Sequence, residues 1–386
     1  MSAKNGVKHD PSAWFELLSE YRLTTLPYDT VLSGVLREDL SPDHPDVLEA
    51  IAAWPAPVHL EHGVDGIDVV LVYQLKAPKK DSLLVHALLL LATLVTTLGS
   101  GALMAGADPF ATRFLELPGF TLPYPSGFDG VKLWLGASFA LPFLGVLLSH
   151  EMGHFYAARM HRVRASLPYF LPFPPYFSVI GTLGAFIRLR GPTVRRSSLF
   201  DIGISGPLAS FILSLPMFAL GLTWSQAVTV PADALTPFAI RFGAQTVWLG
   251  NGVLTHVLAS VFGPGSFGEQ LIVLHPVALA GWLGLFVTAL NLLPLGQLDG
   301  GHILYALFPR RHDRIAQTFL LLLLPLGWLW WGWWAWAALI LVLHRGRVSH
   351  PSVVLPESVM DGPRRALGWV MILMFLLTFA PVPLTL

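Results

Sequence analysis

The stretch LLSHEMGHFYAARM, residues 147–160, decides how the rest of the chain is interpreted. It places two histidines and a glutamate within five residues, at the end of the apolar run LWLGASFALPFLGVLL. Ionisable side chains inside a membrane-length apolar segment are costly to bury and usually belong to a functional site. The stretch therefore predicts a membrane helix that carries chemistry.

The polar residues of this stretch form the pattern H-E-x-x-H, with His150, Glu151 and His154. Residues at positions i and i+4 share one face of a helix, so both imidazoles can bind one zinc ion. Glu151 then lies beside the open coordination position, where it can accept a proton from water. We predict that His150 and His154 are metal ligands and that Glu151 is the catalytic base.

Composition supports a membrane protein. The 386 residues are 54% hydrophobic and only 12% charged, whereas soluble domains are about a quarter charged. The net charge is zero, which gives no reason to expect a nucleic-acid partner. The chain has no cysteine, so a metal must be held by His, Asp or Glu.

The apolar segments predict a mainly α, polytopic membrane helix bundle. A crossing needs roughly 20 apolar residues, and Val247–Phe262 is a weaker, re-entrant or amphipathic candidate. Ile315–Leu343 is interrupted by glycine and proline, so it is either one tilted span or a tight hairpin. We expect six to eight crossings, from the segments Leu83–Met104, Val131–Met160, Phe200–Leu222, Pro276–Pro294, Ile315–Leu343 and Leu367–Leu384.

Residues 1–80 predict a small soluble α+β domain ahead of a membrane domain at 81–386, whose core is 131–304. SPDHPDVLEAIAAW indicates a helix with Ser41 at its N-cap, and PVHLEH with IDVVLVYQL indicates a β-hairpin. These 80 residues contain no apolar stretch typical of a signal peptide. We expect the domain to pack or tether, or to recruit substrate.

Arginine placement predicts the orientation, because cytoplasmic loops are enriched in Lys and Arg. Seven arginines lie between Arg159 and Arg196, whereas the loops at 105–130 and 223–246 hold only Arg113 and Arg241. The N-terminus and the 160–199 loop are therefore expected in the cytoplasm. His150 would lie roughly 14 Å below that face, at about 1.5 Å per helical residue.

A catalytic zinc needs a third protein ligand. Asp299, in NLLPLGQLDGGH at the end of the fourth span, is the main candidate, and Glu269 and Asp201 are weaker ones. His302 is an alternative ligand or a hydrogen-bonding partner of the site. The glycines after Asp299 allow close backbone approach or a break in the helix.

HEMGH together with NLLPLGQLDGGH resembles the site-2 protease family of intramembrane zinc metalloproteases. The resemblance covers residues from about 83 to 343 and includes GTLGAFIRLRG and LFDIGISGPLAS. Within the family, the chain is similar to the bacterial relatives of the chloroplast ethylene-dependent gravitropism-deficient and yellow-green proteins. No PDZ-like insertion is visible, although many bacterial members carry one.

This resemblance implies one Zn²⁺ per chain, held by His150, His154 and Asp299, with Glu151 as the base. It also implies that Asn291 holds the substrate backbone. The expected activity is cleavage of the transmembrane segment of a single-pass protein. We expect a bacterial inner membrane, because residues 1–50 carry many acids and so do not resemble an Arg- and Ser-rich transit peptide. The chain allows a homo-oligomer.

The Pro-rich stretch LPYFLPFPPYFSVIGTLGAFIRLRG is unsuited to a spanning helix. Ser178–Leu189 alternates and contains two glycines, which indicates a re-entrant loop or β-hairpin. It either packs only, or offers an edge strand near Gly184 to an unwound substrate. The spacing of Gly206 and Ser210 indicates close helix packing, against the metal helix.

Two other functions use the same residues. A metal-ion transporter would use the His/His/Asp cluster as a transit site, but transport needs polar residues at several depths. A protease-like scaffold without activity would not need an intact H-E-x-x-H. The clustering at one depth, with a base beside two histidines, favours the zinc endopeptidase.

Overall fold

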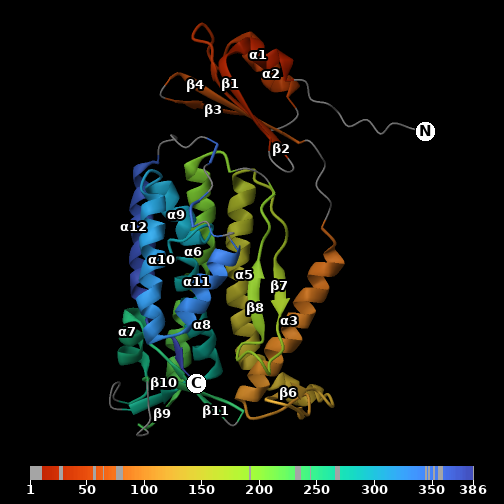
Figure 1. Ribbon diagram of the computed structural model, residues 1–386, viewed down its shortest axis with the longest axis vertical. Helices are drawn as coiled ribbons and strands as arrows, with labels where there is room; N and C mark the ends of the chain where they lie inside the picture. The colour runs from red at the N-terminus through yellow and green to blue at the C-terminus, as the bar shows by residue number, and fades with distance from the viewer. Residues whose placement is uncertain are drawn as a thin grey trace, which may run out of the picture.

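The computed structural model describes most of the chain, in one N-terminal α+β unit and one helical bundle (Figure 1). The described residues are 11–25, 29–54, 58–63, 65–74, 81–190, 193–230, 236–243, 245–265, 270–343, 346, 348–350, 353–354 and 360–385. The expected domain boundary at residue 80 and the candidate ligand Glu269 lie outside them.

The N-terminal unit is a four-stranded antiparallel sheet with two helices on one face. Its strands lie in the order β1-β2-β4-β3. The core beneath the helices contains Trp14, Val47 and Leu71, because alternate residues of each strand point to that face. The elements are α1 (Ser12–Leu17), β1 (Leu18–Thr25), β2 (Asp29–Leu36), α2 (Pro45–Ala53), β3 (Val58–His62) and β4 (Ile67–Gln74).

The predicted hairpin in this unit is confirmed, since β3 pairs with β4 in antiparallel register. The predicted start of helix α2 is wrong by three residues. His44, not Ser41, is the N-cap, and its Nδ1 accepts from the Asp46 amide at 3.4 Å. Pro45 suits the first helical position because it needs no hydrogen-bond acceptor there, and Ser41 instead closes a preceding turn.

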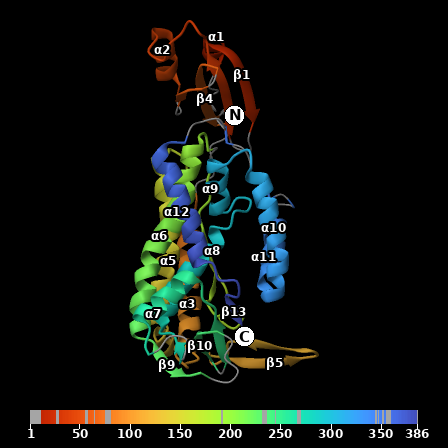
Figure 2. The same ribbon diagram turned by 90° about the vertical axis from the view of Figure 1, so that its left-hand side faces the viewer.

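The second face of the sheet lies on the helical bundle. Val31 and Val70 are buried against Val194, and Arg195 forms an ion pair with Glu61 at 3.0 Å. The unit therefore sits at one end of the bundle, as Figures 1 and 2 show. The segment it contacts is the one that leads from strand β8 (Thr182–Phe186) into helix α6 (Arg196–Thr223).

The bundle is built from long apolar helices in tight contact. Helices α5, α6 and α8 pack together pairwise around a core that includes Phe143, Phe218 and Leu279. Its helices are α3 (Leu83–Met104), α4 (Gly130–Trp134), α5 (Ala137–Met160), α6, α7 (Val253–Phe262), α8 (Pro276–Asn291), α9 (Asp299–Leu307), α10 (His312–Leu329), α11 (Gly332–Leu343) and α12 (Gly362–Thr378).

Among the described residues, two helices are both long and apolar enough to cross a membrane, namely α3 and α6. Helices α7, α8 and α11 are apolar but shorter. Helix α5 has 24 residues but carries the polar motif. The mainly α fold with an N-terminal α+β unit is confirmed, and the number of crossings stays a prediction.

Two expected spans are subdivided. The segment from Val131 breaks between α4 and α5, where Gly136 lies so close to α3 that a Cβ would be 2.0 Å from the Leu98 oxygen. The segment 315–343 forms the hairpin of α10 and α11, which contact each other. Trp334 of α11 donates from Nε1 to the Leu324 oxygen of α10 at 2.8 Å, so the alternative of one tilted span is wrong.

Three small sheets accompany the helices. A five-stranded sheet of order β13-β11-β10-β12-β9 lies at the end of the bundle opposite the N-terminal unit (Figure 1). The candidate span Val247–Phe262 divides between β11 and α7. The remaining strands are β5 (Arg113–Leu117), β6 (Phe120–Tyr124), β7 (Tyr169–Pro172), β8, β9 (Gln226–Thr229), β10 (Phe238–Phe242), β11 (Gln245–Leu249), β12 (Gln270–Val273) and β13 (Leu384–Thr385).

The Pro-rich stretch forms a β-hairpin, since β7 pairs with β8. The expected segment Ser178–Leu189 supplies only the second strand, β8, and the first strand, β7, precedes it. The hairpin is anchored by side chains on both strands. The Tyr169 hydroxyl donates to Asp81 at 2.8 Å, and the Thr182 hydroxyl donates to the Leu171 oxygen at 2.7 Å. The hairpin lies along the bundle beside α5 and α3 (Figure 1).

Candidate active site

The two histidines of the motif lie on one buried face of α5. His150 and His154 are 4% and 8% exposed, and their Nε2 atoms are 3.1 Å apart. This approach follows from the i, i+4 spacing, which brings side chains one turn apart onto one face. The predicted sharing of a face is confirmed.

Asp299 closes the group from another helix. Its Oδ2 lies 3.3 Å from Nε2 of His150 and 3.3 Å from Nε2 of His154. Asp299 was expected at the end of the fourth span. It instead begins the separate helix α9, after the loop 292–298. The loop packs tightly against the first turn of α9, which glycines allow. A Cβ on Gly300 would lie 2.0 Å from a backbone oxygen, and a Cβ on Gly301 would lie 2.4 Å from another.

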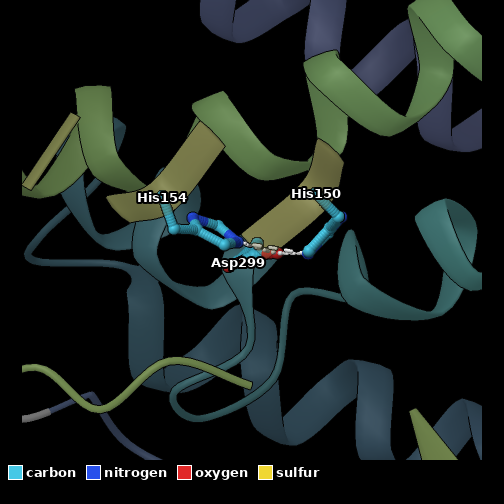
Figure 3. A group of neighbouring side chains, drawn as sticks. All are labelled: His150, His154 and Asp299. Carbon is cyan, nitrogen blue, oxygen red and sulfur yellow. Dashed lines mark hydrogen bonds and ion pairs between the residues drawn. The ribbon is translucent and has the colours of Figure 1, made fainter. Parts of the chain in front are cut away.

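These three side chains fit a zinc ion. They form the one group of three candidate ligands found among the described residues, with ligand atoms within 4.8 Å of one another. Tetrahedral zinc with bonds of about 2.0–2.1 Å separates neighbouring ligand atoms by roughly 3.3 Å, close to the distances seen here. Figure 3 shows the three side chains pointing toward one point, as a zinc site requires.

The other nitrogen of each imidazole is also held. Nδ1 of His154 donates to the Ile202 oxygen at 2.7 Å, which leaves Nε2 free to bind a metal. Nδ1 of His150 lies 3.1 Å from the Ser210 hydroxyl, which also contacts Thr288 of α8 at 2.8 Å. Helix α6 therefore fixes the orientation of both rings.

Glycines allow α6 to approach this closely. A Cβ on Gly206 would lie 2.1 Å from Nε2 of His154, and one on Gly153 would lie 2.4 Å from the Ser205 oxygen. The predicted small-residue packing of Gly206 and Ser210 against α5 is thus confirmed. Ser210 does more than pack, since it contacts a ligand imidazole.

Glu151 and Asn291 border the same cavity of about 240 Å³. Glu151 is 7% exposed. Nδ2 of Asn291 lies 3.2 Å from Nε2 of His150. The cavity is also lined by Ala185, Phe186 and Ile187 at the end of β8, so a strand edge, a carboxylate and the three candidate ligands meet there.

Gly184 lies one residue before this lining and has a φ of +102°. Its amide donates to the Thr182 hydroxyl at 3.0 Å rather than facing the cavity. The expectation that Gly184 itself holds the substrate stays a prediction, and the lining residues Ala185–Ile187 are better placed for it.

His302 also lines the cavity, but its contact is with another segment. Its Nδ1 lies 2.6 Å from Nε2 of His350, and the His350 ring stacks on Tyr305. His302 is not a member of the group of three ligands, so a supporting role suits it better than coordination.

A second histidine–carboxylate cluster was not expected. Asp201 of α6 accepts from Arg364 of α12 at 2.8 and 2.7 Å, and from His161 at 2.8 Å. Ser198 contacts the other nitrogen of His161. Asp201, a weaker candidate ligand, is thus engaged elsewhere. No local pattern links it to Arg364, which is 163 residues away.

Comparison with known proteins agrees with this geometry. Residues 138–326 match the model of the Peptidase family M50. The chain is 34% identical over 201 residues to the probable zinc metalloprotease EGY1, chloroplastic, of Arabidopsis thaliana, covering 52% of this chain and 33% of that protein. It is 33% identical over 215 residues to the EGY1 protein of Oryza sativa subsp. japonica, covering 55% and 35%.

A third relative is the probable zinc metalloprotease EGY2, chloroplastic, of Arabidopsis thaliana. It is 28% identical over 277 residues, covering 70% of this chain and 47% of that protein. The chain therefore spans between a third and about half of the length of these relatives. No solved structure matches it. Residues 138–326, which the family model matches, include H-E-x-x-H and Asp299, the residues that the structure brings together.

Proposed function

Because the chain belongs to peptidase family M50, a family of zinc metalloproteases, we propose that it is an intramembrane zinc endopeptidase. Its substrates would be single-pass membrane proteins, cut within their transmembrane segments. One observation carries the proposal. His150, His154 and Asp299 converge to zinc-ligand distances beside the carboxylate of Glu151, within a bundle of long apolar helices.

Zinc, when bound, would act as a Lewis acid that polarises the scissile carbonyl and lowers the pKa of water. Glu151 supplies the proton transfers. Its carboxylate takes a proton from the water that attacks the carbonyl carbon. It later gives that proton to the amine nitrogen as the C–N bond breaks.

A transmembrane helix hides its peptide bonds in its own hydrogen bonds, so the substrate must be unwound at the site. The end of β8 suits an extended chain because Ala185, Phe186 and Ile187 line the cavity. Asn291, with its amide beside His150, would hold the substrate carbonyl or amide. The β7–β8 hairpin would thus align the scissile bond with Glu151 through strand pairing.

We further propose a bacterial inner membrane with the N-terminal unit in the cytoplasm. The arginines between α5 and α6 support this orientation, and the N-terminal unit contacts the same end of the bundle through Arg195. One zinc per chain is proposed because one candidate group is found among the described residues. The partners would be the bilayer and a single-pass substrate, and a homo-oligomer is compatible with this arrangement.

The test is cleavage of a single-pass peptide by purified protein in detergent or liposomes. We expect cleavage inside the apolar segment, its loss on treatment with a zinc chelator, and its return with zinc. Cleavage that resists the chelator would contradict the metal site. Cation flux through liposomes without any cleavage would favour the transporter, and neither activity would favour a silent scaffold.

A further inference from the structure

The hairpin β5–β6 stands apart from the rest of the bundle. All of its residues except Pro123 are exposed, although six of them are large apolar side chains. Figure 2 shows β5 running sideways from the bundle, across the direction of the long helices, at the end opposite the N-terminal unit. An isolated two-stranded hairpin is at best marginally stable in water, so this exposure needs an explanation.

The register of the hairpin sorts its side chains onto two different faces. Leu115 pairs with Leu122 and Leu117 pairs with Phe120, and directly paired residues point to the same side of a sheet. These four residues therefore form one apolar face, with Arg113 and Tyr124 paired at its base. The other face is polar near the tip, where Glu116 pairs with Thr121, and apolar near the base, where Phe114 pairs with Pro123. The tip of the hairpin is thus amphipathic.

The level of the hairpin along the bundle is set by α3. Helix α3 is one of the two helices that are long and apolar enough to cross a membrane, and it ends at Met104, nine residues before Arg113. Tyr124 and Arg113 suit a membrane interface, because their side chains have an apolar body and a polar end. The hairpin therefore lies where the interfacial layer of a bilayer is expected.

We propose that the face formed by Leu115, Leu117, Phe120 and Leu122 inserts into the interfacial layer of the lipid bilayer, at the surface opposite the N-terminal unit. This rests on the membrane location within the proposed function. The bilayer is favoured over a protein partner because the hairpin runs sideways at the end of α3, where lipid surrounds the bundle. It would lie on the membrane rather than cross it, in the manner of interfacial amphipathic segments.

Phe110, which lies just before β5, would connect the membrane-bound β5–β6 hairpin to the β7–β8 hairpin of the candidate active site. Its ring contacts Tyr176, in the turn of the β7–β8 hairpin, with centroids 6.0 Å apart. Phe110 and Tyr176 also share an apolar cavity of about 310 Å³ with Pro123 of β6. A membrane-bound β5–β6 hairpin would therefore hold the turn of the β7–β8 hairpin at a fixed depth.

The chain lacks cysteine, so single cysteines can report on each face. Leu117→Cys and its opposite-face control Thr121→Cys are labelled with an environment-sensitive fluorophore and placed in phosphatidylcholine vesicles. A second pair, Leu122→Cys and Glu116→Cys, guards against misfolding of one variant. We expect the labels at Leu117 and Leu122 to be quenched several-fold more by lipid-borne spin labels. The labels at Thr121 and Glu116 should be quenched more by aqueous iodide.

Equal quenching of both faces by iodide would overturn the proposal. So would shielding of the Leu117→Cys label from iodide that depends on protein concentration, together with disulfide-linked dimers of the unlabelled variant, because a second copy would then cover the face. Peptide cleavage by the same labelled proteins is measured separately. Lipid quenching without cleavage would contradict the proposed function alone. Cleavage by a protein whose label at Leu117→Cys is quenched by iodide would contradict the hairpin proposal alone.

Discussion

Two histidine–carboxylate clusters lie in the second half of α5 and at its C-cap, and they differ in what neutralises the carboxylate. At the end of α5, Asp201 binds His161 and both arms of the Arg364 guanidinium. Further into the helix, Asp299 faces two imidazoles whose Nε2 atoms lie 3.3 Å from its Oδ2. In the first cluster the positive charge comes from an arginine side chain. In the second cluster the three side chains have the spacing of metal ligands.

The difference shows how the same residue types serve two purposes. A buried carboxylate needs a compensating charge. In the Asp201 cluster, Arg364 provides that charge in a fixed fork geometry, so the cluster fastens α5, α6 and α12. In the Asp299 cluster, three ligand atoms converge on one point, which suits a divalent cation from outside the chain.

The largest effect on cleavage should come from a substitution of Glu151, because it removes the proposed base and leaves the three candidate ligands of the Asp299 cluster in place. Glu151→Gln keeps the shape of the side chain but cannot accept a proton. We expect cleavage to fall by at least about 10²-fold, as for loss of a general base, while bound zinc is unchanged. Metal analysis and a peptide cleavage assay check this, and loss of zinc would identify Glu151 as a ligand or structural residue.

Gly206→Ala should disturb the metal cluster from α6, the helix that packs against His154. The new Cβ would lie 2.1 Å from Nε2 of His154, so the imidazole must move. We expect zinc affinity to fall roughly tenfold or more, as for other changes around metal ligands. Gly145→Ala on α5, where a Cβ meets nothing within 4 Å, is the matched control. Competition with a zinc dye measures both, and equal affinities would contradict the close packing.

The two hairpins can be compared by one substitution. Gly184 and Gly119 have φ of +102° and +91°, with no atom within 4 Å of a Cβ, so alanine at either should cost roughly 1–2 kcal/mol of strain. We expect Gly184→Ala to lower cleavage roughly tenfold, because misplacement by about an ångström is costly. Gly119→Ala should leave cleavage near normal. Similar cleavage by the two variants would argue against substrate pairing at β8.

The smallest effect is expected at the Asp201 cluster. Arg364→Ala should lower the free energy of unfolding by about 1–3 kcal/mol, since it removes two hydrogen bonds to a charged group. Cleavage should fall only a few-fold, and zinc content should not change. The exposed neighbour Arg365 gives the control Arg365→Ala. Thermal unfolding tells them apart, and loss of zinc in Arg364→Ala would show that the two clusters are not independent.

Local pattern was enough to predict several parts of the molecule. H-E-x-x-H fixes the shared face of His150 and His154 because the helical period is local. Helix α3, the β3–β4 hairpin and the strand at 182–186 also follow from composition and alternation. Gly206 and Ser210 were recognised as packing residues from their spacing.

The remainder depends on contacts between distant segments. The sheet of β9 to β13 escapes prediction because strands of two to five residues from separate regions carry little periodic signal. Helix α9 begins at Asp299 because loop 292–298 separates it from α8, which the apolar run alone did not indicate. The pairing of Asp201 with Arg364 joins residues 163 positions apart, and no sequence window contains both.

The central claim is that Asp299 is the third zinc ligand and that His302 is not. Zinc is measured by elemental analysis in the purified wild-type protein, Asp299→Ala and His302→Ala, together with circular dichroism to confirm folding. We predict close to one zinc per chain in wild type, little in Asp299→Ala, and most of the wild-type content in His302→Ala. Zinc retained by folded Asp299→Ala but lost from His302→Ala would contradict the geometry proposed for the site.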